Sequence, residues 1–192
     1  MVSEGKYLKN SGFTFVEILV VIVTMSVLFS FGYAGYRDYA RRQNLEAWAR
    51  KVSGDLRMAQ QLASSGAKPS NDCGVLEGYH FRVNAHFAHQ RYYFGPICSD
   101  FSDGQTNAHE KVVQMPEDIF INAIEISGVA AGSDLRIVFK VLEQGTNIPA
   151  GSSATITLAQ VGNIRKVRRP NWRDYGVPFI DVIVTSGGEV RY

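Results

Sequence analysis

The pattern of hydrophobic and polar residues changes abruptly near the start of the chain. Residues 1–12 (MVSEGKYLKNSG) are mostly polar, and an apolar run begins at Phe13. Between Phe13 and Tyr36 the only charged residue is Glu17. A helix needs about 20 predominantly apolar residues to cross a bilayer. The pattern therefore predicts a membrane-spanning helix over residues 13–36.

The helical pattern continues beyond this segment and becomes amphipathic. Residues 37–66 contain no proline, and good helix formers dominate them. The spacing predicts one helix from about Phe13 to about Ser65, roughly 80 Å long at ~1.5 Å per residue. Gly66 and Pro69 are the expected stop. Apolar residues recur three or four apart and form one stripe along residues 37–66, namely Leu45, Trp48, Ala49, Val52, Leu56, Ala59, Leu62 and Ala63.

After residue 70 the period changes from helical to alternating. Short runs rich in aromatic and β-branched residues are separated by turn clusters, which is typical of strands. An amphipathic helix needs an apolar partner, and a sheet with one apolar face supplies it. We therefore expect an α+β fold in which the helix packs against a mainly antiparallel β-sheet domain over residues 67–192. The predicted strands are Tyr79–Val83, Tyr92–Phe94, Ile119–Ile121, Leu135–Phe139, Thr155–Leu158 and Phe179–Val184, and residues 188–192 are expected to close a last hairpin.

The composition agrees with a chain that folds around a core. Of 192 residues, 45% are hydrophobic and 20% are charged, and the formal net charge is +2. This charge is too small to draw the whole molecule to nucleic acid or to an acidic membrane surface.

The chain has two cysteines, Cys73 and Cys98. Their spacing matches neither a CxxC redox pair nor a four-ligand zinc site. In a domain outside the cytoplasm the natural reading is one disulfide, worth roughly 3 kcal/mol in the loop-entropy model. The alternative is two separate buried thiols.

Residue patterns typical of catalysis or metal binding are missing from the sequence. His80, His86, His89 and His109 form no metal-ligand pattern beyond the His86/His89 pair, and no nucleophile or phosphate-binding motif occurs. Residues 99–104 carry oxygen ligands but lack the spacing of a known calcium loop, so we expect a turn there. We therefore expect no catalytic residues, no metal site, no cofactor and no enzymatic activity.

The junction of the polar and apolar segments carries a specific motif. Residues 9–22 read KNSGFTFVEILVVI, a basic leader that ends in glycine, then an aromatic residue, then a glutamate four residues later in an apolar helix. This motif resembles the type IV prepilin signature. The resemblance implies that residues 1–12 are a leader peptide, that a prepilin peptidase cuts between Gly12 and Phe13, and that the new amino group of Phe13 is methylated. It also implies other pilins or pseudopilins and an inner-membrane assembly platform as partners.

Glu17 is the residue that most needs a reason to lie in this helix. A charged side chain costs roughly 2.5–3.5 kcal/mol at the centre of a membrane helix. In a filament the carboxylate can meet the Phe13 amine of a neighbouring subunit and so help to set the register. The alternative is that Glu17 only complements the helix dipole or reaches the interface.

Two features differ from the family pattern, and one conflicts with it. Phe15 stands where leucine is commoner, and the apolar segment lacks the mid-span proline of many major pilins. Three arginines follow the span (Arg37, Arg41 and Arg42), against two lysines before it (Lys6 and Lys9). A positive-inside count therefore opposes an inward N-terminus, and we give the motif more weight. A competing reading is a secretory signal cut after Ala34, which leaves Glu17 unexplained.

A second, looser resemblance concerns the globular part. Residues 55–63, 78–81 and 183–191 are similar to the minor pseudopilins of the GspH/FimT type, in which the long helix packs against two small sheets. This similarity implies a minor subunit of a type IV pilus or a type II secretion pseudopilus, first held in the inner membrane by one pass, with its C-terminal domain outside the cytoplasm. A major pilin is the alternative.

A basic cluster near the C-terminus supports a second function, nucleic-acid binding. Five cations lie within residues 165–173, and Trp172 could stack on a base. Some FimT-like proteins are linked to DNA uptake through basic residues near a Gly-Arg-x-Arg pattern, but here residues 188–191 read GEVR. The alternative is a solvated loop or one that contacts another subunit. The cluster consists of Arg165, Lys166, Arg168, Arg169, Trp172 and Arg173.

The nucleic-acid hypothesis predicts salt-dependent DNA binding by residues 37–192 in a gel-shift assay. Replacing Arg165, Lys166, Arg168 and Arg169 together by alanine should abolish the shift. No shift at low salt, or an unchanged shift in the quadruple variant, would rule the hypothesis out.

Overall fold

The computed structural model describes residues 13–69, 73–84, 90–99, 110–131, 134–142, 145–160 and 178–192. The chain divides into two compact units, Met1–Ala40 and Arg41–Tyr192. One helix, α1 (Phe15–Ser65), supplies residues to both units. The boundaries predicted after residues 12, 36 and 66 stay predictions.

The ends of α1 follow local sequence signals. The helix begins two residues later than expected, because Thr14 caps it rather than joining it. It ends as predicted at Gly66, which has a φ of 63°. There the N–H of Ala67 donates to the Leu62 carbonyl at 3.2 Å, and the N–H of Gly66 donates to Ala63 at 3.1 Å. Glycine adopts this left-handed conformation without the steric cost of a side chain.

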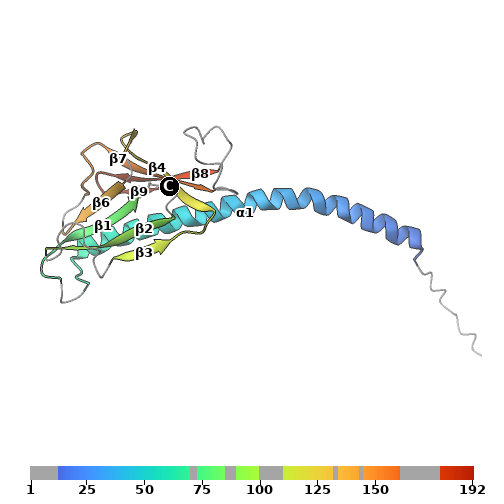
Figure 1. The fold of residues 1–192 in the computed structure, drawn as a ribbon, viewed down its shortest axis with the longest axis horizontal. Coiled ribbons are helices and arrows are strands. Elements are labelled where there is room, and N and C mark those ends of the chain that lie inside the picture. The colour runs from blue at the N-terminus through green and yellow to red at the C-terminus, as the bar shows by residue number, and fades with distance from the viewer. Residues whose placement is uncertain are drawn as a thin grey trace, which may run out of the picture. The chain divides into compact units, whose positions relative to one another are not determined.

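The second unit is built from the latter part of α1 and two antiparallel sheets (Figure 1). The first sheet has the order β3-β2-β1-β6, and the second has the order β5-β4-β7-β8-β9. The α+β class and the antiparallel sheets are therefore confirmed. The strands are β1 (Leu76–Asn84), β2 (Arg91–Cys98), β3 (Lys111–Gln114), β4 (Ile119–Ile126), β5 (Val129–Ala130), β6 (Asp134–Lys140), β7 (Ser153–Gln160), β8 (Phe179–Thr185) and β9 (Val190–Arg191).

All six predicted strands form, and so does the final hairpin, in which Val184 pairs with Val190. Sequence reasoning missed β3 and β5, which are short edge strands. It also missed a bulge at Asn122, where the register of β4 against β7 shifts between Ile121 and Ala123. The bulge keeps Ile121 and Ile124 on the core face although they are three residues apart.

One core joins the helix to both sheets. Six residues of the predicted stripe are buried, and Trp48 and Leu62 are partly buried against them. The buried residues of the stripe are Leu45, Ala49, Val52, Leu56, Ala59 and Ala63. Apolar side chains from β1, β2 and β6 and from β4, β7 and β8 pack into the same core.

Polar contacts hold the helix to each sheet at one turn. The hydroxyl of Tyr92 in β2 donates to Asp55 of α1. Two residues along α1, Arg57 donates to the carbonyl of Val190 in β9 at 3.0 Å. Burial, together with the Asp55 carboxylate, raises the pKa of Tyr92, so its hydroxyl stays protonated and remains a donor.

The outer face of the first sheet contains a buried ionisable cluster. His80 and Arg82 lie on the face of β1 opposite the core, and Arg82 pairs across the sheet with Arg136. Glu110 lies 2.8 Å from His80 Nε2 and 3.7 Å from an Arg82 nitrogen, and its side chain is only 4% exposed. This carboxylate offsets the repulsion between two facing arginines.

Burial lowers the pKa of His80, and the hydrogen bond to Glu110 opposes the effect only in part. A histidine whose folded pKa is depressed stabilises the fold above its unfolded pKa of about 6.5, and this stability is lost as the pH falls. We therefore expect the melting temperature of the chain in mild detergent to fall between about pH 7.5 and about pH 5.5. His80→Gln, which cannot titrate, should flatten this part of the profile. Parallel profiles for the two proteins would contradict the assignment.

Candidate assembly site

The first turn of α1 is closed by a reciprocal cap. The Thr14 N–H donates to Glu17 Oε2 at 2.8 Å, and the Thr14 hydroxyl donates to the same oxygen at 3.0 Å. In return, the Glu17 N–H donates to the Thr14 hydroxyl oxygen at 3.3 Å. This is a capping box, which satisfies backbone donors that have no partner within the helix. A carboxylate here also complements the positive end of the helix dipole.

The cap defines what Glu17 does within a single chain. Its carboxylate is exposed and is held by its own backbone and by Thr14. The expected pairing with the Phe13 amine of a neighbouring chain is intermolecular and stays a prediction. Phe13 itself is 83% exposed. Gly12 and the rest of the leader lie outside the described residues.

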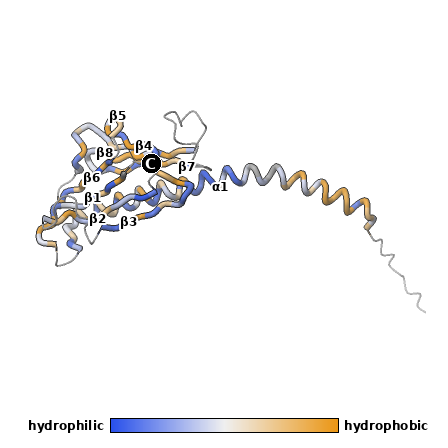
Figure 2. Tube along the Cα trace, in the orientation of Figure 1, coloured by the Kyte–Doolittle hydropathy of each residue, from blue (hydrophilic) through white to orange (hydrophobic). Residues whose placement is uncertain are grey.

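Beyond the cap, α1 presents an apolar surface that nothing in the described chain covers. By length and composition α1 is long and apolar enough to cross a membrane, and none of its apolar window is buried within the protein. Figure 2 shows the apolar colour along this first part of the helix. Exposed side chains here include Phe15, Val16, Ile18, Leu19, Val20, Val21, Ile22, Val23, Met25, Val27, Leu28 and Phe29. So long an exposed apolar run in water is a strong sign of a partner, either lipid or protein.

The three hydroxyl side chains within this run bond to the helix itself. Thr24 donates to the Val20 and Val21 carbonyls at 3.0 and 2.9 Å. Ser26 donates to the Ile22 carbonyl at 2.7 Å, and Ser30 donates to the Ser26 carbonyl at 2.8 Å. Each polar group is therefore satisfied without water, which hydrocarbon surroundings require.

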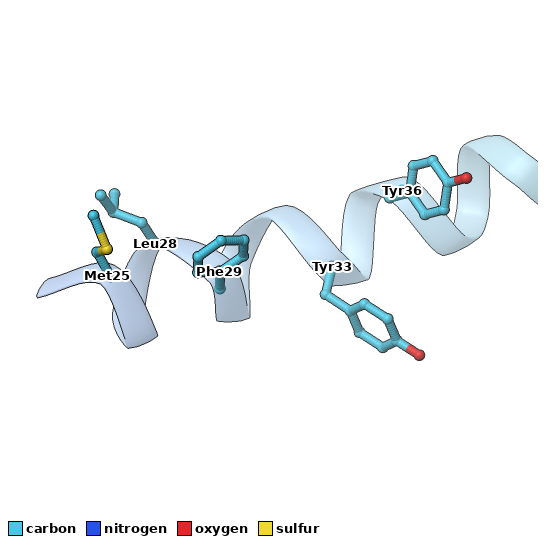
Figure 3. A pocket seen from close by; sticks show the side chains of 5 residues that line it. All are labelled: Met25, Leu28, Phe29, Tyr33 and Tyr36. Atoms are coloured by element: carbon cyan, nitrogen blue, oxygen red, sulfur yellow. The ribbon is translucent and has the colours of Figure 1, made fainter. Parts of the chain in front are cut away.

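Larger side chains gather towards the end of the run. Met25, Leu28, Phe29, Tyr33 and Tyr36 line a shallow, open hollow on the helix surface (Figure 3). Its lining is almost entirely apolar apart from the two tyrosine hydroxyls. Arg37 lies 5.9 Å from the centre of the Tyr33 ring. The hollow is therefore amphipathic, with an apolar body and a polar rim.

The other sequence candidates lie away from α1 or outside the described part of the chain. Cys73 and Cys98 are joined in a disulfide, with Cα atoms 5.4 Å apart. It links the segment before β1 to the end of β2, next to the β1–β2 pairing of Leu76 with Cys98. The basic cluster of residues 165–173 lies outside the described residues, as do His86, His89 and His109. Within the described residues, no three His, Cys, Asp or Glu side chains are placed to hold a metal ion.

Comparison with known proteins supplies no relative. No protein-family model, no curated protein and no solved structure matches the chain.

Sequence reasoning identified Glu17 but missed its partner, Thr14. The signal was present, because Thr-x-x-Glu immediately before an apolar run is the sequence signature of a capping box.

The cap predicts a local effect of mutation. In the unprocessed chain, Thr14→Val removes both hydroxyl contacts and should weaken the first turn by about 1 kcal/mol. We expect the amides of that turn to exchange about fivefold faster in detergent micelles, as measured by NMR. Thr14→Ser keeps the hydroxyl and should exchange like the wild type. Equal exchange in all three chains would show that the cap contributes nothing.

Proposed function

We propose that the chain is a pilin-like filament subunit, a minor pilin or pseudopilin of a type IV pilus or type II secretion pseudopilus. In this proposal it is made as a membrane-anchored precursor, cut after Gly12, methylated at Phe13 and assembled through the first part of α1. It acts by assembly and carries out no catalysis.

One observation supports the proposal above the others. A single helix is apolar and exposed over its first part, and over its second part it supplies the stripe that forms the core with both sheets. The second part already has its partner within the chain, whereas the first part has none among the described residues. A helix shared in this way attaches a folded domain to something else that is apolar.

The position of the cap adds support. Glu17 follows the Gly12–Phe13 junction in the prepilin-like motif and lies in the first turn of the apolar helix. In the proposed filament the carboxylate exchanges its contacts with Thr14 for the amine of a neighbouring Phe13. Such an exchange costs little, because the partner that it gives up is on the surface.

The two antiparallel sheets along one helix agree with the looser GspH/FimT resemblance. The disulfide agrees with a domain outside the cytoplasm, since such bonds persist in oxidising compartments. These two points favour the minor-subunit form of the proposal.

The test uses variants of the full chain in cells that carry a prepilin peptidase. Gly12→Leu should keep residues 1–12 and be absent from sheared filaments. Glu17→Ala should be cut normally but be at least about tenfold depleted in filaments, because it leaves a buried amine unpaired. Both effects are read by mass spectrometry of the membrane and filament fractions.

Glu46→Ala is the matched control. Glu46 is an acidic residue on the same helix, but it forms an exposed ion pair with Arg50 in the second unit. Exposed pairs contribute little, so this variant should assemble like the wild type. Normal assembly of Glu17→Ala, or equal loss in both glutamate variants, would contradict the role of Glu17.

A further inference from the structure

The exposed part of α1 ends in a cluster of tyrosines and arginines that the proposed assembly role does not explain. Tyr33, Tyr36 and Tyr39 are 65%, 68% and 62% exposed. Arg37 lies between them, and Arg41 and Arg42 follow directly. Apolar side chains precede the cluster without a break in the helix, so the chain changes here from hydrocarbon-like to charged within two turns.

The side chains of this cluster are oriented for a boundary. Figure 3 shows the hydroxyl ends of Tyr33 and Tyr36 directed away from Met25, Leu28 and Phe29, towards the C-terminal side of the helix. The same direction leads to the arginines. A tyrosine with an apolar ring and a hydroxyl directed to the polar side is the residue type that concentrates at membrane–water interfaces.

A second polar marker lies one membrane thickness away. At ~1.5 Å per residue, the axial distance from Glu17 to the three tyrosines is about 24–33 Å. The hydrocarbon core of a bilayer is about 30 Å thick. Between the two markers, the hydroxyls of Thr24, Ser26 and Ser30 are satisfied within the helix. Nothing described in this interval therefore needs water.

We propose that Tyr33, Tyr36 and Tyr39 bind the headgroup layer of a phospholipid bilayer, with Arg37, Arg41 and Arg42 beside the lipid phosphates. This seat sets the depth of the chain before assembly and rests on the membrane stage of the proposed function. It places Thr14 and Glu17 at the opposite headgroup layer and not near the bilayer centre. The Glu17 carboxylate is then tolerated because it lies at the boundary with its capping contacts intact.

Three considerations favour lipid over a second copy of the chain as the first occupant. The tyrosines are followed at once by arginines, which would repel the same cations on an identical helix in register. Phospholipid phosphates offer the complementary charge. The distance to the Thr14–Glu17 cap matches a bilayer, whereas a helix–helix contact sets no such length.

The experiment measures the depth of single tryptophans in vesicles of phosphatidylcholine brominated either near the headgroup or near the acyl end. The full chain is used with Trp48 and Trp172 replaced by Phe, and one reporter is added at a time. Tyr36→Trp and Phe15→Trp should lose more fluorescence to bromine near the headgroup. Met25→Trp, the matched mid-span control, should lose more to bromine near the acyl end.

Two results would overturn the inference. Stronger quenching of Tyr36→Trp by deep bromine in a vesicle-bound chain would place the tyrosines inside the hydrocarbon, while the proposed membrane anchoring would stand. A chain that does not sediment with the vesicles would overturn both the inference and the membrane stage of the proposed function. The same quenching order for Tyr36→Trp and Met25→Trp would show that the helix lies flat on the surface and would also overturn the inference.

Discussion

The packing of the second part of α1 between its own apolar stripe and two sheets is the constraint on which the rest of the domain depends. Each sheet has one face that needs cover, and the same buried residues of α1 reach both. The contacts of Asp55 with Tyr92 and of Arg57 with Val190 then fix the helix against each sheet. Because this part of α1 is fully used inside the unit, the exposed first part is left to meet lipid or other chains.

Much of this arrangement follows from the sequence. The apolar run, the stripe at helical spacing and the stop at Gly66 predicted α1 to within two residues, because helix periodicity and caps are local signals. The long strands were equally readable from alternation. The short strands were not, because residues 111–114 form a strand only by pairing with Arg91–Phe94 of β2, a contact distant in sequence. The bulge at Asn122 was hidden for a related reason, since it replaces regular alternation with a spacing of three.

The candidate site shows the same division between local and distant information. Glu17 could be singled out because a carboxylate is costly in an apolar helix, and Thr14 could have been found from the capping pattern. The ionisable cluster of His80, Arg82 and Glu110 could not, because Glu110 reaches His80 only after β3 has paired with β2. A buried histidine on the outer face of a sheet has no signature in sequence spacing.

The account's central claim is that the exposed part of α1 becomes the filament core after cleavage at Gly12. The most direct test is quantitative mass spectrometry of filaments sheared from cells, reading the N-terminal peptide and the abundance of the chain. The account predicts a methylated peptide that begins at Phe13, present in small amounts beside a more abundant pilin. A dominant chain with that peptide would instead make this a major pilin. A chain that begins near Gly35, or one that keeps residues 1–12 and is absent from filaments, would contradict the claim.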